Sequence, residues 1–310
     1  MIKGVVRDAE TNEPIPFAHV IVENTVTLTN LDGQFILNSP TEGKVPSLEV
    51  SVIGYQHTSH KIGDFDQFYE ILLTPSTVSL GEVTVLSGET LIDRIVDRFH
   101  LNYEMSSHHM IGYYKEDLSS TDSIYYIAEG IVDIYVPSNV DFDKTLVSPI
   151  RTRKKVFRTM EDHLTFLKGN ASDMAKSSIW RKDSFLSQRN RKNYDFFYNG
   201  VSTIGNQEVY VIEFEPNNSK GDTKGTLYVE EESLAILKME YQPITDGSFW
   251  TNVSWVEEFS ERGGLYELLR VSYQGSWEEY SNDYTYKALL VANKVAVLDE
   301  LPKKQDHHLN

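Results

Sequence analysis

The sequence predicts a mainly β protein, made of a small β-sandwich, a connecting helix and a larger curved antiparallel sheet. Three observations predict this class. Residues 4–86 consist of short runs rich in β-branched and aromatic residues, separated by turn residues. Residues 91–101 carry apolar side chains at helical spacing. From residue 110 onward, longer runs of alternating apolar and polar residues are joined by short polar turns, which favours pairing between successive strands.

The composition is sufficient for two folded parts and excludes several chemistries. The chain has 310 residues, of which 40% are hydrophobic and 12% aromatic, so each part can bury a core of its own. It contains no cysteine, which excludes disulfides, zinc-thiolate or iron–sulfur sites and a cysteine nucleophile. The formal charge of 29 − 46 = −17 repels phosphate backbones, so we expect no nucleic-acid partner. No run of about eighteen apolar residues occurs, so we expect no transmembrane helix.

The first part, residues 1–86, is expected to form the sandwich. Pro14 and Pro16 follow its first run and cannot donate to a central ladder, so they set the entry to the next strand. Gly33 suits the positive φ of a hairpin turn that begins at Asn30. The expected strands are residues 4–7, 18–23, 34–37, 48–53, 68–73 and 83–86.

Four spaced motifs of this part occur in the order of a known family: Gly4–Asp8, Pro14–Val20, Thr29–Phe35 and Ser51–Tyr55. With these motifs, residues 2–86 closely resemble the carboxypeptidase-like regulatory domain, a transthyretin-like β-sandwich. The resemblance implies a non-catalytic accessory module of the kind that precedes larger modules in envelope proteins of Bacteroidetes-type bacteria. It also implies a periplasmic or cell-surface protein associated with the outer membrane, whose export signal we expect to have been removed.

A helix is expected to connect the two parts, over residues 87–104. Its apolar stripe consists of Leu91, Ile92, Ile95, Val96 and Phe99. At this spacing the side chains share one helix face. We expect that face to pack on the sheet that follows rather than to bind a partner.

The second part, residues 105–298, is expected to form the curved antiparallel sheet. A polar tail, residues 299–310, follows it and is expected to be disordered. The expected strands are residues 110–116, 123–136, 208–215, 225–230, 234–241, 250–259, 265–273 and 284–295.

Short motifs of the second part also resemble known proteins. It is similar to the C-terminal region of a group of uncharacterised Bacteroidetes envelope proteins in the motifs Asn102-Tyr103, Gly112–Tyr114 and Ala128–Gly130. It further resembles the curved half-barrel of the outer-membrane lipoprotein carriers in the runs Val209–Phe214, Gly225–Val229 and Ala235–Glu240. These resemblances imply a half-barrel-like sheet.

A long segment of the second part, residues 137–205, is poor in strand signal, and we expect a partly helical insertion there. Between residues 151 and 192 it holds twelve basic and four acidic residues, a net charge of 12 − 4 = +8, which leaves −17 − 8 = −25 for the remainder. Such polarity would attract an anionic partner. The alternative is that the segment neutralises the acidic sheet of its own domain.

Aromatic residues concentrate near the end of the chain. On an exposed concave face, their rings would stack on sugars or line a lipid cleft. Alternating β spacing makes core packing the default interpretation of these rings, and the two interpretations share residues if the half-barrel has an open concave face. The residues that we predict to bind a ligand are Arg151, Arg153, Lys154, Lys155, Arg158, Trp250, Trp255 and Trp277.

The sequence contains no motif that predicts catalysis. It lacks Gly-x-Ser-x-Gly, the P-loop and Gly-x-Gly-x-x-Gly. The pairs His108-His109 and His307-His308 lack the i, i+4 spacing of zinc proteases, and we expect solvated turns at both. The carboxylate runs Glu230–Glu232 and Glu257-Glu258 are also expected to be solvated turns. We therefore predict no catalytic residue, no metal site and no cofactor.

The sequence favours non-enzymatic binding or scaffolding in the cell envelope, with a lipid, a glycan or an envelope protein as the partner. The alternative is a carboxylate-dependent hydrolase acting on an envelope glycan or peptide, which needs a cleft with two acidic side chains of divergent pKa. A further alternative is a structural interaction protein whose sandwich offers an edge strand to a partner chain.

Overall fold

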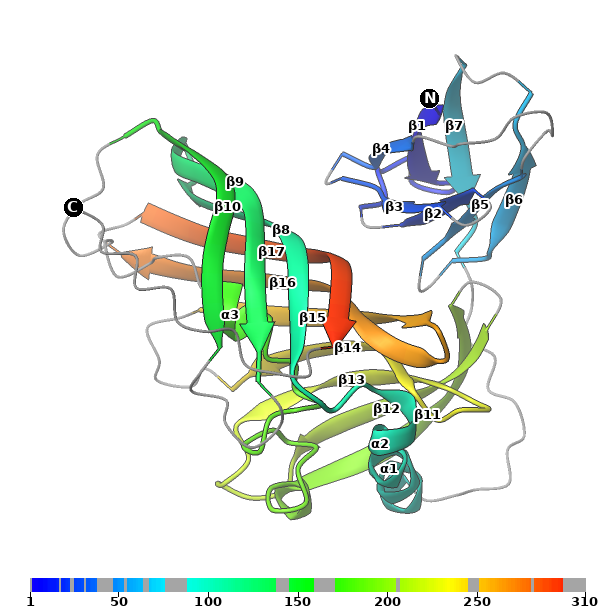
Figure 1. The fold of residues 1–310 in the computed structure, drawn as a ribbon, viewed down its shortest axis with the longest axis vertical. Helices are drawn as coiled ribbons and strands as arrows, with labels where there is room; N and C mark the ends of the chain where they lie inside the picture. The colour runs from blue at the N-terminus through cyan, green and yellow to red at the C-terminus, as the bar shows by residue number, and fades with distance from the viewer. Residues whose placement is uncertain are drawn as a thin grey trace. The chain divides into compact units, whose positions relative to one another are not determined.

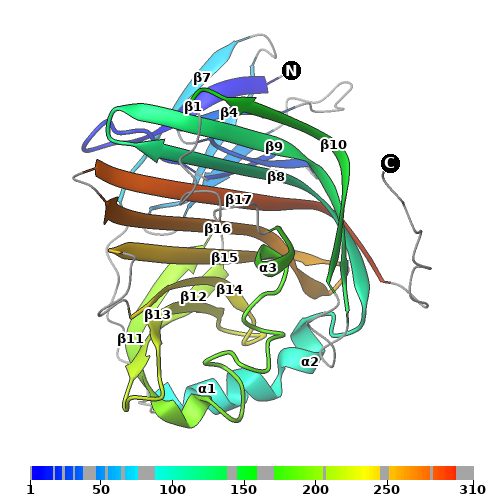
Figure 2. The ribbon, with the colours of Figure 1, turned by 90° about the vertical axis from the view of Figure 1, so that its left-hand side faces the viewer.

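The computed structural model divides the chain into two compact units, drawn from two directions in Figure 1 and Figure 2. One unit comprises Met1–Val85 together with Tyr198–Val211 and Glu230–Glu232, and the other comprises the remaining residues. Among the residues that the structure describes, no helix is long and apolar enough to cross a membrane. The described residues are 2–16, 18–22, 25–30, 32–37, 47–52, 55–63, 67–75, 88–137, 145–158, 171–204, 207–244, 251–279 and 282–297.

The N-terminal sandwich consists of two small sheets. Its strands are β1 (Ile2–Asp8), β2 (His19–Val22), β3 (Thr25–Leu28), β4 (Gln34–Leu37), β5 (Ser47–Ser51), β6 (Thr58–Lys61) and β7 (Phe68–Leu73). One sheet has the order β4-β1-β7, in which β1 pairs antiparallel with β4 and parallel with β7. The other has the order β3-β2-β5-β6 and is antiparallel throughout.

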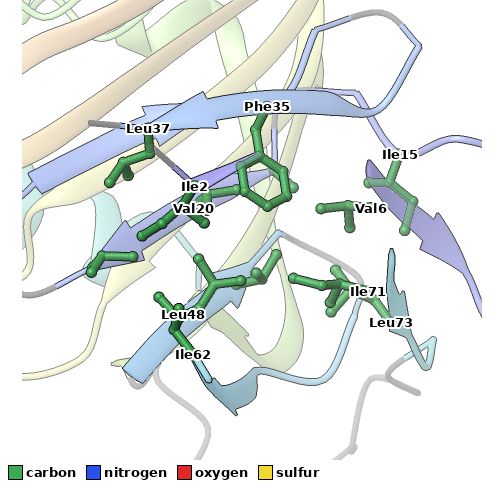
Figure 3. Close-up of a cluster of buried hydrophobic side chains, with 13 residues drawn as sticks. Ile2, Val6, Ile15, Val20, Phe35, Leu37, Leu48, Ile62, Ile71 and Leu73 are labelled. Carbon is green, nitrogen blue, oxygen red and sulfur yellow. The ribbon is translucent and has the colours of Figure 1, made fainter. Parts of the chain in front are cut away.

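The core of the sandwich lies between these sheets and is apolar (Figure 3). Successive side chains of a strand point to opposite faces, so alternate residues of each strand reach the core. Ile2 and Val6 on β1 are fully buried, for example, whereas Lys3 between them is not. The buried cluster consists of Ile2, Val6, Ile15, Ala18, Val20, Val22, Phe35, Leu37, Leu48, Val50, Ile62, Ile71 and Leu73.

Two strands of the sandwich, β3 and β6, are not among those that the sequence predicts. β6 reads Thr-Ser-His-Lys with most of its residues exposed, so it has no apolar signal of its own. β3 reads Thr-Val-Thr-Leu and does alternate, but over four residues only. Gly33 has a φ of 72°, as the predicted hairpin turn requires. The strand expected at residues 83–86 lies outside the described residues.

Asp8, at the end of β1, accepts hydrogen bonds from a side chain and from a turn. Its Oδ2 accepts from the Tyr55 hydroxyl at 2.6 Å, and its Oδ1 accepts from the backbone N–H groups of Glu10 at 2.7 Å and Thr11 at 2.9 Å. The hydrogen bond from Tyr55, followed by those from the backbone, lowers the pKa of Asp8 below its ordinary value of 3.8. The same bond raises the pKa of Tyr55 to about 12.

The rest of the described chain builds one sheet of ten antiparallel strands, which we call the large sheet. Its strands are β8 (His108–Ser120), β9 (Ser123–Val136), β10 (Leu146–Val156), β11 (Tyr194–Ile204), β12 (Gln207–Pro216), β13 (Thr223–Glu230), β14 (Ile236–Pro243), β15 (Asn252–Arg262), β16 (Leu265–Glu279) and β17 (Asn282–Val297). Their order is β10-β9-β8-β17-β16-β15-β14-β13-β12-β11. The last strand of the described residues, β17, therefore lies between β8 and β16. The predicted mainly β fold is confirmed.

The connecting helix packs on the large sheet through its apolar stripe. It is divided into α1 (Gly88–Asp97) and α2 (Phe99–Asn102), and Leu91 of the stripe is 2% exposed. After α2, the Tyr103 hydroxyl donates to the Ile236 carbonyl at 2.8 Å and accepts from the Ile236 N–H at 2.6 Å. The predicted stripe is thus buried except for Val96, which is half-buried, and Tyr103 joins the end of the helix to β14.

The segment 137–205 contains more strand than its sequence predicts. Its described residues include all of β10 and β11, in addition to the short helix α3 (Ala171–Met174) and a 3₁₀ turn at Arg191–Asn193. Every residue of β10 is exposed among the residues that the structure describes, and the strand forms the end of the sheet. A strand of this kind has no alternation of apolar and polar residues for a sequence pattern to detect.

Candidate functional site

One face of the large sheet is covered by α1, α2, α3 and the residues that follow α3, and we call it the inner face (Figure 2). The ring of Tyr103, after α2, lies 5.5 Å from that of Phe259 on β15. The ring of Phe185, after α3, stacks on that of Phe214 on β12 at 4.1 Å. The opposite face is the outer face. Inner-face positions on β12 to β15 are therefore packed against helix and loop residues.

A line of directly opposed residues crosses the inner face from β14 to β10. Opposed residues of an antiparallel pair point to the same face of the sheet, so the register alone assigns them to one side. The line begins at Tyr241, beside the packed region, and ends at Lys154 on the end strand of the sheet. We call it the inner row, and its members are Tyr241, Trp255, Tyr273, Ala288, Glu116, Ala128 and Lys154.

The first part of the inner row is aromatic. The Trp255 ring is parallel to that of Tyr241 at 6.3 Å and lies 4.8 Å from that of Tyr273. All three side chains are half-buried. Burial raises the pKa of Tyr273 to about 12, so its phenol stays neutral at physiological pH. This part of the row offers partly exposed ring faces without a formal charge.

The middle of the inner row holds a buried carboxylate, Glu116, between two alanines, Ala288 and Ala128. Glu116 is 6% exposed, and its Oε2 accepts hydrogen bonds from the hydroxyls of Tyr114 at 2.7 Å and Tyr286 at 2.8 Å. Burial raises the pKa of Tyr286 far above its ordinary value, so this hydroxyl remains a donor. The small alanine side chains leave the carboxylate and its two phenols as the polar centre of the row.

The far end of the inner row is cationic. The ammonium group of Lys154 lies 4.4 Å from the centre of the Tyr126 ring, a distance at which cations are attracted to an aromatic face. Lys154 is exposed, whereas Tyr126 on the neighbouring strand is 1% exposed. The row therefore runs from neutral rings, past a buried carboxylate, to a solvated positive charge.

Of the predicted basic ligand residues on β10, the structure places Lys154 alone on the inner face. Its neighbours along the strand alternate with it and belong to the outer face, where Arg153 forms an ion pair with Glu129. Arg158 follows the strand and is exposed. The basic residues away from the inner row are thus Arg151, Arg153, Lys155 and Arg158.

The predicted tryptophans have different settings. Trp255 belongs to the inner row. Trp277 is 1% exposed and stacks on Tyr284 at 5.2 Å, so it is a core residue of the sheet. Trp250 lies outside the described residues. From the predicted set, the structure therefore places Trp255 and Lys154 on the same face of the sheet, on β15 and β10, with four strands between them.

A second buried carboxylate, Glu257, lies next to the inner row on β15. Its Oε1 accepts from the hydroxyls of Tyr241 at 2.6 Å and Ser178 at 3.0 Å, and its Oε2 accepts from the Ser177 hydroxyl. The Ser178 N–H is 3.2 Å from both oxygens. Burial raises the pKa of Glu257 above its ordinary value of 4.5, and these donors oppose that effect. Glu257 thereby joins the residues after α3 to the sheet beside Tyr241.

The expectation that Glu257 and Glu258 lie in a solvated turn is wrong. Both belong to β15, and Glu258 forms a buried ion pair on the outer face with Arg270, whose Nε and Nη2 donate at 2.9 and 2.6 Å. Glu230 is also buried, at 8% exposure, within β13. Alternation through Trp255 and Phe259 is the signal that would have placed Glu257 on the covered face.

The histidine pair that begins β8 also differs from expectation. His108 is 4% exposed and its ring lies 5.6 Å from that of Trp180, while His109 forms a 3.4 Å contact with Asp133. Both belong to a strand rather than a solvated turn; the other predicted pair, His307-His308, lies outside the described residues. Within the described ranges, no group of three or more His, Asp or Glu side chains could hold a metal ion.

A hollow of about 490 Å³ opens mainly on the outer face of β12 to β15. Its lining includes Phe197, which is 45% exposed, together with Glu213, Lys224 and Gln242. Tyr241 and Trp255 also contribute to it. The inner row differs from this hollow because it combines ring faces, a buried carboxylate and a lysine in one line.

Comparison with known proteins identifies the first part of the chain. Residues 2–85 match the family model of the CarboxypepD_reg-like domain. The N-terminal sandwich is therefore a CarboxypepD_reg-like domain, which confirms the resemblance that its four motifs carry. No curated protein sequence matches the chain.

Several solved structures are similar to the chain, all at low sequence identity. A domain from Vibrio parahaemolyticus, described as an outer membrane lipoprotein-sorting protein domain, is 11% identical over 70% of this chain and 95% of its own, with a TM-score of 0.35. A DUF1329 family protein from Desulfovibrio piger is 10% identical over 70% and 96%, with a TM-score of 0.32. A membrane-associated protein of unknown function from Bacteroides fragilis is 10% identical over 94% and 97%, with a TM-score of 0.19.

Proposed function

We propose that this protein is a non-enzymatic binding protein of the cell envelope, and that the inner row of its large sheet holds an amphipathic lipid with an anionic head group. The observation that carries the proposal is the order of chemistry along the row. Neutral rings occupy one end, at Trp255 and Tyr273, and a solvated ammonium group occupies the other, at Lys154. An anionic amphiphile has the same polarity along its length.

The two ends of the row suit the two parts of such a ligand. The half-buried aromatic side chains have few rotatable bonds, so they lose little conformational entropy when an acyl chain covers their rings. Lys154 lies on β10, at the end of the sheet, and is exposed, so a head group can reach it without being fully desolvated. The alanines at 288 and 128 place small side chains between the two ends.

The envelope address is supported by the N-terminal domain. Its four motifs resemble the regulatory domains that precede larger modules in envelope proteins of Bacteroidetes-type bacteria. We propose a periplasmic or cell-surface location on this basis, with a lipid of the outer membrane as the ligand class.

The hydrolase alternative receives less support from the buried carboxylates. Glu257 has a raised pKa, as a general acid would, but its oxygens accept from Tyr241, Ser177 and Ser178. The Oε2 atom of Glu116 accepts from two phenols. These bonds account for both carboxylates as structural acceptors, so we place binding ahead of hydrolysis.

Calorimetric titration with three defined probes tests the proposal. Dodecanoate has an acyl chain and an anionic head, dodecyl maltoside has the same chain with a neutral sugar head, and maltohexaose has no chain. We expect the affinity to fall in that order, with no release of cleaved product. If maltohexaose bound most tightly, the proposed ligand would be a glycan and not a lipid. Cleavage of dodecyl maltoside would favour the hydrolase.

A pair of neighbouring substitutions gives a matched control. Lys154→Glu and Lys155→Glu change the net charge equally, but the side chains belong to opposite faces of β10. We expect Lys154→Glu to weaken dodecanoate binding about tenfold, or about 1.4 kcal/mol, and Lys155→Glu to change it less than about twofold. Equal effects of the two variants would show that the ligand is attracted by net charge and not held by the inner row.

A further inference from the structure

The end strand β10 has an unusually accessible edge. It pairs with β9 on one side, and no other strand among the described residues pairs with it. Although α3 approaches β10, all eleven residues of the strand are exposed. A sheet edge of this kind presents unpaired backbone groups, which are a template for another strand.

The register of β10 shows which backbone groups face outward. The Phe157 N–H donates to the Tyr125 carbonyl at 2.8 Å, so this residue pair is hydrogen-bonded. Hydrogen-bonded and non-bonded pairs alternate along an antiparallel ladder, and the register is continuous from residue 151 to residue 156. The backbones of Arg151, Arg153 and Lys155 therefore bond to β9, and those of Thr152, Lys154 and Val156 point to the open side.

The charge of this edge selects its partner. The strand reads Leu-Val-Ser-Pro-Ile-Arg-Thr-Arg-Lys-Lys-Val, with four basic residues and no acidic residue. A second copy of β10 added to this edge would bring like charges together, which disfavours dimerisation through it. An acidic strand would place carboxylates opposite these side chains, and on both faces of the sheet, because Lys154 and Lys155 belong to opposite faces.

We propose that β10 binds an acidic, extended segment of another protein, which adds to the large sheet as a further strand. The main-chain groups of Thr152, Lys154 and Val156 would bind the backbone of the segment, and the basic side chains would select for carboxylates. The backbone edge is a different surface from the inner face, and Lys154 is the residue that the two proposed sites share.

A substitution that removes one outward donor but keeps every charge tests the proposal. Thr152→Pro removes an N–H that faces the open edge and donates no hydrogen bond to β9, and proline is tolerated at such edge positions. Thr152→Val is the matched control, because it keeps the N–H. The probe is a fluorescent peptide with the sequence acetyl-Glu-Val-Glu-Val-Glu-Val-Glu-Val-amide, titrated into the full chain and followed by anisotropy.

We expect Thr152→Pro to weaken binding of this peptide at least tenfold and Thr152→Val to change it less than about twofold. With the unaltered protein, a second peptide in which proline replaces each valine keeps the charge but cannot form a ladder, and we expect it to bind at least tenfold more weakly. Equal binding of the two peptides would overturn the proposal in favour of simple charge attraction, even if Thr152→Pro failed to fold. A dimer in sedimentation that Thr152→Pro dissociates would assign the edge to a second copy and would also overturn it.

Discussion

The two β-rich parts of the chain treat buried polar groups in opposite ways. The N-terminal sandwich has an apolar core, and its Asp8, which is 7% exposed, has a pKa lowered by the Tyr55 hydroxyl. The large sheet instead buries Glu257 beside the inner row, and burial raises the pKa of this carboxyl group. Buried charges cost stability unless they are paired, and proteins often retain them at functional sites. On this difference rests our proposal that the large sheet, and not the sandwich, carries the binding site.

The largest expected effect is on the buried ion pair of the large sheet. Arg270→Met leaves Glu258 buried without its cation, and we expect a loss of about 3–5 kcal/mol in the free energy of unfolding. Replacing both partners, with Glu258→Leu and Arg270→Met together, should cost clearly less, because no charge is then left unpaired. Urea unfolding of both variants provides the measurement, and equal losses would show that the pair is not energetically coupled.

The sandwich should respond to the loss of apolar volume instead. Leu73 is fully buried and Leu72, next to it on β7, is 51% exposed. We expect Leu73→Ala to cost about 2–5 kcal/mol and Leu72→Ala less than about 0.5 kcal/mol. Because the sandwich has a buried cluster of its own, its transition should be followed at the residues of that cluster, for example by hydrogen exchange. A large effect of Leu72→Ala would contradict the placement of β7.

The raised pKa of Glu257 predicts a pH dependence of smaller size. Between its ordinary value of 4.5 and the raised value, the folded protein holds a proton that the unfolded chain releases, so stability falls as the pH rises. One such proton changes the free energy of unfolding by up to about 1.4 kcal/mol per pH unit. Glu257→Gln lacks this term, so the variant should gain stability relative to the unaltered protein over this window. If the two proteins differed in the free energy of unfolding by an amount independent of pH, the pKa of Glu257 would not be raised in the folded state.

The pH dependence of stability that Asp8 contributes should have the opposite sign to that of Glu257 and should be the smallest of these effects. Its lowered pKa gives the folded state a contribution that is present above pH 3.8 and is lost as the pH falls through the lowered value. Asp8→Asn should therefore lose less stability than the unaltered protein on acidification, as measured by the melting temperature of the sandwich. Identical acid profiles would show that the Tyr55 bond does not hold the carboxylate.

The sequence predicted the fold better than the site, for a physical reason. Alternating runs such as residues 123–136 predicted β9, and the motifs of residues 2–86 predicted the sandwich. The strands β6 and β10 were missed because exposed strands show no apolar alternation. The inner row could not be predicted, because cross-strand register decides that Lys154 and Trp255 share a face.

Other residues of the site could not be placed from the sequence either, because strand pairing decides the face to which each one belongs. Lys154 and Lys155 are chemically identical and adjacent, and only pairing with β9 assigns them to opposite faces. The four donors around Glu257 come from β14 and from residues after α3, far away in the sequence. Such convergence follows from the packing of the whole sheet and leaves no local pattern.

Native mass spectrometry of gently purified protein, with identification of any extracted lipid, tests the central claim most directly. Tyr273→Glu adds a negative charge to the inner row, and Gln274→Glu adds the same charge to the outer face at the next position. Comparison of their melting temperatures checks that both variants fold. We predict that the unaltered protein and Gln274→Glu retain an anionic lipid, or take one up from dodecanoate, and that Tyr273→Glu does not. Equal lipid retention by both variants, or an unaltered protein that stays empty after exposure to dodecanoate, would contradict the proposed function.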